Sequence, residues 1–546
     1  MFCISQKLTI LVPENHFRID ETNLLILSHL KDVESYNDLS NYEEITLSLN
    51  QVEYHFNTKP NYLGFKDSYQ VSNSSIQFVL YFTQLPIISI DTQNNIIDEP
   101  KVHANFIYAD SEQVLTSDIG IEIRGASSQG YPKKTYDLEF WEDNTGQETK
   151  NVKFGNLRSD DDWILDALYN EPLRLRSYIA NKIWLDMHTP HYINSESNAK
   201  AGADVNYVEM FLNGIYNGIY NISEQIDQKQ LKLKSYNGTI RGELYKGISW
   251  GASTFESLPS YNNSSRIWGG YEMKSPNDDE TTDWENLYQF TNFVLNSSNS
   301  DFNDNIWNKF NYDNYTDYFI FLNLLRAADN TGKNIYLAKY TTNGSYFYIP
   351  WDLDGCFGTI YNGTNQNITN DILTNGLFDR VIKLNPNNYS NTISSKWFEY
   401  RNTILKENNL ISKIENQYQY LLDNKIYERE KLIYSNYSFG QQDVTYMIDW
   451  LYNRLSFLDT YFGGLLSTKD IETHKTNNFV YPNPTNDRIY LSTTNQTTEN
   501  AYKIYNTSGE LIDSGIATSN YISIEKLIIG NYFLIINNQT HKFIVE

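Results

Sequence analysis

Near the middle of the chain, apolar residues recur first at the spacing of a helix and then at the spacing of a strand. The helical run ends at position 325 and comprises Tyr315, Tyr318, Phe319, Leu322 and Leu325. This spacing predicts an amphipathic helix that faces a core. Residues 329–332 have the composition of a turn, and alternation over 334–340 predicts a half-buried strand. The Asn-Gly dipeptide at 343–344 favours a hairpin, with 345–350 as the return strand.

Closing this hairpin brings its two open ends together. Asn334 and Asp352 then meet, and Asp329 lies one short turn away. Three oxygen-bearing side chains at one place can hold a hard cation such as Mg²⁺ and present a carboxylate to a hydroxyl group. Protein kinases use the same order of residues, with the first Asp accepting the substrate proton and the Asn and second Asp holding magnesium. The alternative is that these residues only form turns and cap a loop.

A loop of small residues follows a predicted sheet. Three strands of that sheet are expected at 87–90, 104–108 and 119–123. The loop runs from Arg124 through Ser127 and Ser128, and its two glycines allow backbone N–H groups to approach phosphate oxygens. A tight hairpin needs the same residue types, so the loop alone leaves both interpretations open.

The strand after this loop places Lys134 on the same face as the apolar residues of 136–140. Lys133 falls on the opposite face, where we expect it to be solvated. A lysine on a core face is costly unless a carboxylate or a bound anion pairs with it. Glu224 ends the second strand of a predicted hairpin in phase with apolar residues, so it is the expected partner, and Glu209 is a weaker candidate.

Other basic residues have two interpretations each. Arg176 lies on the inner face of a helix predicted over 173–187, so it either points inward or extends to the surface. Lys246 and Lys274 occupy short aromatic-rich segments and either reach a phosphate or are exposed. The three aspartates at 160–162 are expected to form a solvated turn and helix cap.

The whole pattern predicts an α+β protein of several domains. We expect a small β-rich unit at 1–82, a main domain at 83–465, a linker at 466–478 and a small β-sandwich at 479–546. The main domain is predicted to end in helices at 397–405, 414–433 and 444–462. The Asn- and Thr-rich residues 362–395 before them are expected to be lightly structured.

Composition narrows the classes of function. The chain has 546 residues, of which 40% are hydrophobic and 44 are tyrosine, so it is globular. Its net charge of -24 argues against a nucleic-acid groove or an anionic membrane surface as partner. Two cysteines are too few for a disulfide framework or a structural zinc site. No run of 18 apolar residues predicts a transmembrane helix, and Met1–Val12 lacks the features of a signal peptide.

Several ordered motifs resemble the CotH kinase family, the atypical secreted or spore-coat protein kinases. They are the motif Arg124-Gly125-x-Ser127-Ser128-x-Gly130-x-Pro132-Lys133-Lys134-x-Tyr136, the Arg176 helix, the Asn213-Gly214 hairpin ending at Glu224, and Ile349-Pro350-Trp351-Asp352-Leu353-Asp354-x-x-Phe357-Gly358. The resemblance spans about residues 83–465. It implies a two-lobed, kinase-like fold and phosphorylation of Ser or Thr in a protein, with ATP and Mg²⁺ or Mn²⁺.

The resemblance also implies roles for residues. Asp329 is the expected catalytic base, Lys134 contacts the phosphates, and Glu224 orients Lys134. Asn334, Asp352 and Asp354 are the expected metal-binding residues. The residues expected at the nucleotide are Arg124, Ser127, Ser128, Lys134, Arg176, Lys246 and Lys274. Two departures are Ala327-Ala328, where ordinary kinases have His-Arg, and Gly355-Cys356, where the family often has an aromatic residue.

The tail from Val480 to Glu546 is similar to the sorting domain of the type IX (Por) secretion system of Bacteroidetes-type bacteria. The motifs are Tyr481-Pro482-Asn483-Pro484-Thr485, the Gly509 turn and Leu527-x-x-Gly530-x-Tyr532. The similarity implies the type IX machinery as a partner and a secreted or cell-surface location. Such cargo also carries a Sec signal, so we expect either a start upstream of the printed one or a lost N-terminus.

Two other functions remain open from the sequence. Asp352 and Asp354 lie on one side of an extended segment, about 6–7 Å apart, and such a carboxylate pair beside many aromatic residues suits a glycoside hydrolase. Alternatively, the chain is a surface adhesin or scaffold that keeps a kinase-like fold without catalysis. Cleavage of a glycan without nucleotide would favour the first, and thermal stabilisation by nucleotide would oppose it. The presence of Lys134, Asp329 and Asp352 argues against the second, since a pure binding protein has no need of all three.

Overall fold

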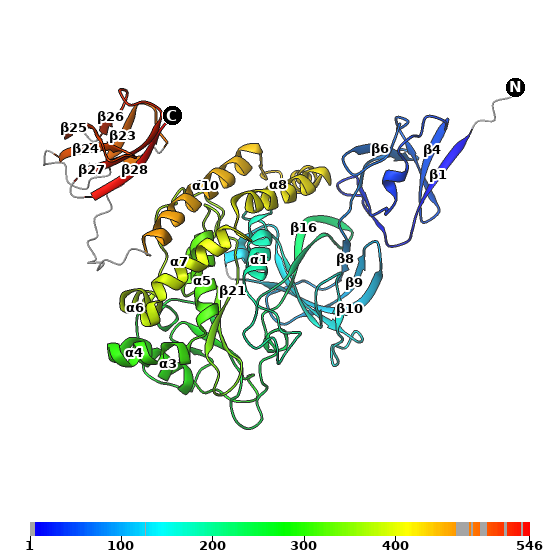
Figure 1. The fold of residues 1–546 in the computed structure, drawn as a ribbon. Helices are drawn as coiled ribbons and strands as arrows, with labels where there is room; N and C mark the ends of the chain where they lie inside the picture. The colour runs from blue at the N-terminus through cyan, green and yellow to red at the C-terminus, as the bar shows by residue number, and fades with distance from the viewer. Residues whose placement is uncertain are drawn as a thin grey trace. The chain divides into compact units, whose positions relative to one another are not determined.

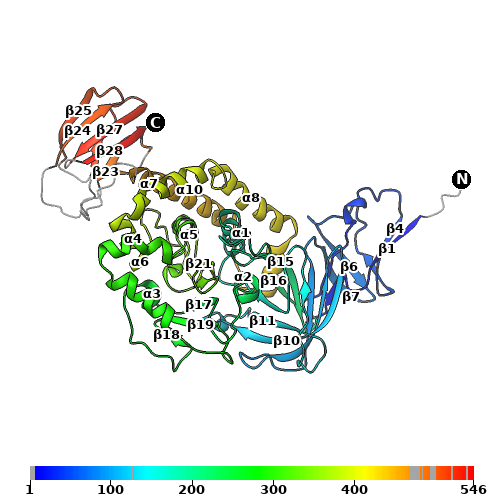
Figure 2. The same ribbon diagram turned by 60° about the horizontal axis from the view of Figure 1, so that its bottom comes forward.

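A computed structural model describes residues 6–125, 127–465, 480–481, 484–491, 500–517, 521–536 and 539–546 (Figures 1 and 2). The chain divides into two compact units, Met1–Ser467 and Thr468–Glu546. The predicted linker lies outside the described residues. Helices and sheets both contribute, as the predicted α+β class requires. Within the described residues, no helix has the length and apolarity needed to cross a membrane.

The N-terminal part is a seven-stranded sheet with its own apolar core. Its strands are β1 Lys7–Val12, β2 Phe17–Asp20, β3 Leu25–Ser28, β4 Glu44–Leu49, β5 Val52–Phe56, β6 Ser68–Asn73 and β7 Ile76–Phe82. They pair in the order β1-β4-β5-β6-β7-β3-β2. The core includes Ile10, Leu47 and Leu80, so the alternating apolar positions of these strands close one face.

A closed seven-stranded barrel follows. Its strands are β8 Ile87–Asp91, β9 Val102–Ala109, β10 Val114–Arg124, β11 Thr135–Trp141, β14 Asp162–Asp166, β15 Val205–Leu212 and β16 Ile215–Glu224, in the order β10-β11-β14-β16-β15-β8-β9. The hairpin predicted at Asn213-Gly214 joins β15 and β16, with both residues at positive φ. Asp160 ends β13 (Ser159–Asp160), which pairs with β12 (Val152–Lys153), Asp161 is the bend after it and Asp162 begins β14, so their assignment to a helix cap was wrong.

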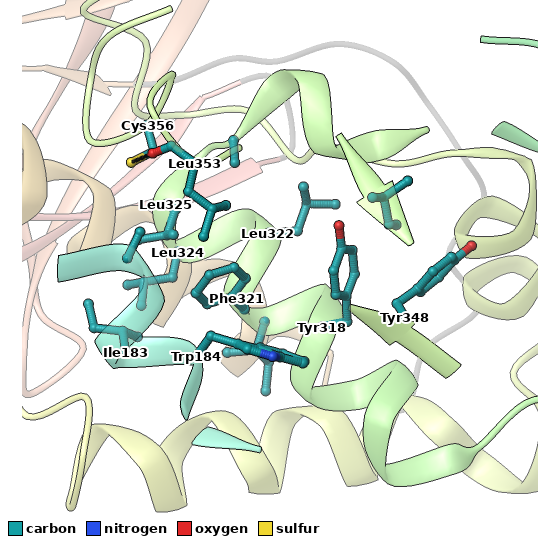
Figure 3. Packing of buried hydrophobic residues seen from close by; sticks show 14 of the residues in the cluster. Ile183, Trp184, Tyr318, Phe321, Leu322, Leu324, Leu325, Tyr348, Leu353 and Cys356 are labelled. Atoms are coloured by element: carbon teal, nitrogen blue, oxygen red, sulfur yellow. Dashed lines mark hydrogen bonds between the residues drawn. The ribbon is translucent and has the colours of Figure 1, made fainter. Parts of the chain in front are cut away.

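A second, five-stranded sheet carries the central hairpin. Its strands are β17 Glu243–Gly247, β18 Ile267–Trp268, β19 Tyr271–Ser275, β20 Ile335–Lys339 and β21 Tyr346–Pro350, in the order β18-β19-β17-β20-β21. The predicted helix is α5, Tyr312–Leu325, and it begins where the Asn311 side chain accepts from the Asn314 N–H. It is buried on every side rather than on one face (Figure 3). A helix that is apolar all round belongs in the interior.

Helices surround this core. They are α1 Arg176–Met187, α2 Gln228–Leu231, α3 Glu285–Asn296, α4 Asn299–Lys309, α6 Gly376–Leu384, α7 Tyr389–Arg401, α8 Glu407–Asp423, α9 Ile426–Ile433 and α10 Gln441–Gly464. Two expectations were wrong. Residues 362–395 contain α6 and the start of α7. The single helix expected over 414–433 is broken between α8 and α9, where Lys425 adopts a left-handed conformation.

The C-terminal unit consists of two small sheets. One contains β22 Val480–Tyr481, β23 Arg488–Leu491 and β26 Tyr521–Ser523. The other contains β25 Leu511–Ala517, β24 Asn500–Asn506, β27 Gly530–Ile536 and β28 Gln539–Val545, in that order. Ile489 and Ile522 from the first sheet share a core with Ile504, Leu534 and Phe543 from the second.

Candidate functional site

A cavity of about 800 Å³ lies between the barrel and the five-stranded sheet. This volume is within the range of small-molecule sites. Its charged lining residues are Arg124, Lys133, Asp166, Lys246, Asp329, Lys333, Asp352 and Asp354. Three segments far apart in sequence therefore bring acids and bases to one hollow.

The mouth of the central hairpin forms one wall of the cavity. Ile335 pairs with Pro350, and the Trp351 N–H donates to the Asn334 carbonyl oxygen at 3.1 Å. Asn334 and Asp352 follow at the open end, and both line the cavity with φ of 54°. Asn and Asp tolerate this left-handed conformation better than most residues. The hairpin thus brings these two side chains to the same cavity, as closure of its strands predicts, although the connecting loop spans residues 340–345.

Asp329 reaches the same cavity from the 3₁₀ turn Ala328–Thr331 that follows α5. The Lys333 N–H donates to the Asp329 carbonyl oxygen at 3.0 Å, which closes the turn. Lys333 also lines the cavity, and its Nζ lies 5.8 Å from the ring centre of Trp250, which is half exposed at the rim. The predicted convergence of Asp329, Asn334 and Asp352 is present in the geometry.

The carboxylates in the cavity are poorly hydrated and repel one another. Asp352 is open to the cavity, but protein surrounds it otherwise, and this burial raises its pKa, with a further contribution from Asp329 and opposition from Lys246 and Arg124. Burial and then Asp352 hold the pKa of Asp354 well above its usual range. The Asn170 amide donates to Asp354 Oδ2 at 2.5 Å.

The chemistry of this donor set fits a hard divalent cation. Asp352 and Asp354 provide carboxylate oxygens, and Asn334 provides an amide oxygen in the same cavity. Mg²⁺ prefers oxygen ligands, and a cation would relieve the repulsion that raises the pKa values of both carboxyls.

Two basic residues face these acids. Arg124 donates through Nη1 to Asp137 Oδ2 at 2.7 Å, and its guanidinium lies 5.3 Å from the ring centre of Trp351. Lys246, on β17, has no hydrogen bond or ion pair with any described side chain. Burial lowers its pKa to about 8, with further contributions from Arg124 and Lys274. A desolvated, unpaired cation of this kind suits an anionic ligand.

The small-residue loop borders the cavity through Gly125 and Ser128. Gly125 has φ of 105°, and a Cβ there would lie 2.0 Å from Ser128 Oγ. Glycine is therefore required at this position. Residue 126 and the side chain of Ser127 lie outside what the structure describes, so the predicted role of Ser127 stays a prediction.

The inward lysine was assigned to the wrong residue. Strand β11 begins only at Thr135, so the alternation of its faces does not extend back to the lysine pair. Lys134 Nζ donates to the carbonyl oxygens of Gln129 and Tyr131, at 2.6 and 2.5 Å, and does not line the cavity. Lys133 is the buried lysine and lines the cavity, with 1% of its surface exposed.

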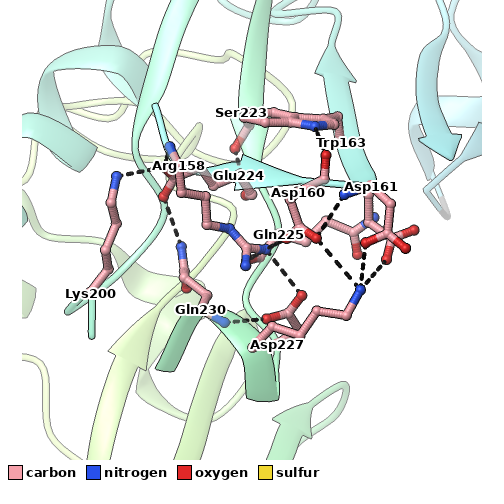
Figure 4. Close-up of polar contacts among 12 residues, drawn as sticks. Arg158, Asp160, Asp161, Trp163, Lys200, Ser223, Glu224, Gln225, Asp227 and Gln230 are labelled. Atoms are coloured by element: carbon pink, nitrogen blue, oxygen red, sulfur yellow. Dashed lines mark hydrogen bonds and ion pairs between the residues drawn. The ribbon is translucent and has the colours of Figure 1, made fainter. Parts of the chain in front are cut away.

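Glu224 is buried as predicted, but its partners are different (Figure 4). Lys200 Nζ donates to Glu224 Oε1 at 2.5 Å, the Arg158 N–H donates to the same oxygen, and the Gln230 amide donates to Oε2. The weaker candidate, Glu209, pairs with Arg429. Neither glutamate contacts Lys134, because Lys134 folds back onto its own loop.

Two other predicted nucleotide-binding residues lie away from the cavity lining. Arg176 is buried, which confirms the inward alternative, but it forms an ion pair with Glu171. Lys274 is exposed on β19, and its Nζ lies 2.9 Å from Glu272 Oε1. The structure therefore separates these two basic residues from Arg124 and Lys246.

The aspartates at 160–162 form another acidic group, and their carboxylate oxygens approach one another within 4.8 Å. Lys229 Nζ lies 2.5 Å from Asp161 Oδ1, and Arg158 forms an ion pair with Asp160. Figure 4 shows Arg158 beside Asp160 and Asp161. Basic side chains already neutralise the charge that a metal ion would compensate.

Sequence reasoning missed Asp166 and Glu430. Asp166 ends β14 and lines the cavity, and burial followed by Asp352 raises its pKa to about 6. A signal was available, because Asp166 directly follows the apolar run Trp163-Ile164-Leu165. Glu430 accepts from Lys133 Nζ at 2.7 Å across 297 positions, and no local pattern indicates that contact.

Comparisons with known proteins agree with the motifs. The family model described as CotH kinase protein matches residues 121–458, and the one described as Secretion system C-terminal sorting domain matches residues 479–546. The comparison with curated proteins gives no match to this chain. The first model covers more than half of the sequence and includes the whole cavity lining, and the second indicates type IX export to the cell surface or the medium. The chain belongs to the CotH kinase family, which implies a kinase-like fold and the use of ATP, and it carries a C-terminal secretion sorting domain.

Proposed function

We propose that the protein is a secreted or surface-attached protein kinase that transfers the γ-phosphate of ATP to Ser or Thr in a protein, with Mg²⁺ or Mn²⁺. The observation that carries this proposal is the cavity in which Lys246 and Arg124 face Asp352 and Asp354, with Asp329 at the same site. Phosphoryl transfer depends mainly on positioning and charge neutralisation, and this cavity offers groups for both.

Each group has a role in the proposal. Arg124 and Lys246 bind phosphate oxygens, and the backbone of the loop at Gly125 approaches them closely. Asp329 accepts the proton of the attacking hydroxyl and orients it. Asn334, Asp352 and Asp354 hold the metal ion, which when bound neutralises charge on the phosphates.

The half-exposed rim gives a macromolecular substrate access to Asp329. Trp250 and Tyr361 line the cavity and are 51% and 53% exposed. By contrast, Ile164 and Val205 at the barrel wall are almost completely buried. A protein hydroxyl therefore enters from the rim, since a folded acceptor cannot reach the enclosed wall.

The domain boundaries belong to the same proposal. Residues 83–465 form the two-lobed catalytic domain, 1–82 an N-terminal β unit, 466–478 a linker and 479–546 a β-sandwich for sorting. The sorting domain engages the type IX export machinery. All four segments belong to one exported chain.

Incubation of the purified chain with γ-labelled ATP, Mg²⁺ or Mn²⁺, and Ser-rich peptides tests the proposed activity. Label should appear on the peptide or on the chain itself, and Asp352→Asn and Asp329→Asn should each abolish it. Asp449→Asn, an exposed substitution on α10, is the control and should transfer label normally. Absence of label with the unchanged protein under both metals would contradict the proposal.

A further inference from the structure

Lys133 is held in the cavity wall by a residue from α9. Its Nζ donates to Glu430 Oε1 at 2.7 Å and to the Ile219 carbonyl oxygen at 2.5 Å. Both charged side chains are completely buried. An ammonium group has three N–H donors; two have oxygen acceptors, and the Tyr220 ring centre lies 4.7 Å from Nζ, while the side chain lines the cavity.

Glu430 is itself fixed from several directions. The Ile219 N–H donates to Oε1 at 2.8 Å, and Arg174 donates to Oε2 at 2.8 Å. Gly218 leaves the room for this arrangement, since a Cβ there would lie 2.2 Å from Glu430 Oε1 and 3.0 Å from Lys133 Nζ. Strand β16 is therefore shaped around the ion pair.

The neighbouring residue, Arg429, points to the N-terminal unit instead. Its guanidinium donates to both oxygens of Glu209, at 2.6 and 3.0 Å, and lies 5.1 Å from the ring centre of Tyr81 on β7. Thr83 Oγ1, just after β7, donates to Glu209 Oε1 at 2.5 Å. One buried carboxylate thus joins α9 to the end of the N-terminal unit.

Two more contacts fix the same junction. The Gln84 N–H donates to Asn424 Oδ1 at 2.7 Å, just before α9 begins. The Tyr216 N–H donates to Asp20 Oδ2 at 2.9 Å, which joins β16 to β2. The N-terminal unit therefore contacts both elements that hold Lys133, namely α9 and β16.

We propose that Glu430 and Arg429 are positioning residues for the proposed kinase reaction. In this proposal Lys133 binds phosphate, and the N-terminal β unit holds α9 in place. Glu430 acts on Lys133 directly, while Arg429 acts through α9. The inference rests on the proposed function for the identity of the ligand. The N-terminal unit lies outside the part matched by the kinase family, which begins at residue 121, whereas α9 lies within it.

Full-length Arg429→Gln, Arg429→Lys and Thr83→Val test the coupling. Glu428→Gln is the matched control, because Glu428 lies one residue away, is half exposed and forms an ion pair with Lys425 at the surface. For each folded variant, calorimetry measures binding of MgATP and of magnesium tripolyphosphate. Mass spectrometry after brief treatment with acetic anhydride measures acetylation of Lys133, with and without MgATP.

Thr83→Val should weaken MgATP binding by about fivefold, the effect of one buried hydrogen bond, and Arg429→Gln by more. Both should increase acetylation of Lys133, and Arg429→Lys should recover part of the loss. Glu428→Gln should match the unchanged protein. If Arg429→Gln does not fold, Thr83→Val decides the result.

A merely structural role would lower the unfolding temperature of Thr83→Val without changing Lys133 acetylation or MgATP affinity, and that result would overturn the inference. If the protein is not a kinase, the unchanged protein transfers no label from ATP. The effect of the Thr83 and Arg429 substitutions on acetylation of Lys133 can still be measured, because that assay does not need nucleotide. The two failures are therefore distinguishable.

Discussion

Asn330 donates its side-chain amide to the carbonyl oxygen of Asn334 at 2.5 Å, and the same nitrogen donates to the Trp351 carbonyl oxygen at 2.7 Å. Asn330 is 3% exposed, and Tyr318 on α5 donates to its carbonyl oxygen at 2.8 Å. One buried amide therefore joins both strands of the central hairpin at the mouth of the cavity. The positions of the proposed metal ligands depend on a residue outside the ligand set.

Replacing Asn330 by alanine should loosen the hairpin mouth. Two buried carbonyl oxygens lose their side-chain donor, so the free energy of unfolding should fall by about 2–4 kcal/mol. Magnesium affinity, measured by titration, should fall with it. Asn453→Ala, an exposed position on α10, is the control and should change neither quantity. An Asn330→Ala protein with unchanged magnesium affinity would contradict the positioning role.

Lys246 and Lys274 form a matched pair for testing the phosphate site. They lie on adjacent strands, but Lys246 lines the cavity without a hydrogen bond or ion pair to any side chain that the structure describes, whereas Lys274 is exposed beside Glu272. Lys246→Met should weaken MgATP binding by about tenfold or more, since a charge-assisted hydrogen bond to phosphate is lost. Lys274→Met should leave it within about twofold. Calorimetry with both variants measures the difference, and equal effects would exclude Lys246 as the phosphate ligand.

Local signals predicted the central hairpin well. The two strands form where apolar alternation predicts them, so the meeting of Asn334 and Asp352 follows from the sequence, but the loop between them spans residues 340–345 and the register is not that of a two-residue Asn-Gly turn. The burial of α5 on every side does not follow, because it depends on helices that come later in the chain, among them α10.

The error at the lysine pair has a simple physical origin. Tyr136, Leu138 and Phe140 are buried as the alternation predicts, but β11 begins at Thr135, so the alternation does not extend to the two lysines in the loop before it. Pro132 keeps the preceding residues in the loop. Local sequence patterns could not predict the role of Glu430, because its contact with Lys133 spans 297 positions.

Alanine substitutions at two glycines with positive φ can distinguish the stability cost of backbone strain from the cost of displacing Glu430. Gly214 has φ of 75° and no atom within 4 Å of an added Cβ, whereas a Cβ at Gly218 would meet Glu430. Gly214→Ala should cost about 1 kcal/mol of unfolding free energy, from the backbone alone. Gly218→Ala should cost more and should also weaken MgATP binding, because Glu430 must move away from Lys133. Denaturant unfolding and calorimetry check both variants, and equal losses of stability would contradict this account.

Acid sensitivity should reveal the charge of Glu430. Burial alone would raise its pKa, but Lys133 and Arg174 outweigh burial and hold the pKa below its ordinary value of 4.5. The unfolded chain therefore takes up this proton at a higher pH than the folded one, so the stabilisation is present above pH 4.5 and is lost as the pH falls through the lowered pKa.

Glu430→Gln should lower stability at neutral pH by about 3–5 kcal/mol, since it leaves two buried cations unpaired. Its unfolding free energy should also fall less steeply with acid than that of the unchanged protein, as measured by denaturant unfolding between pH 3 and 7. Glu428→Gln, on the exposed side of the same helix, provides the comparison, and an equally steep fall in Glu430→Gln would show that Glu430 is not charged in the folded protein.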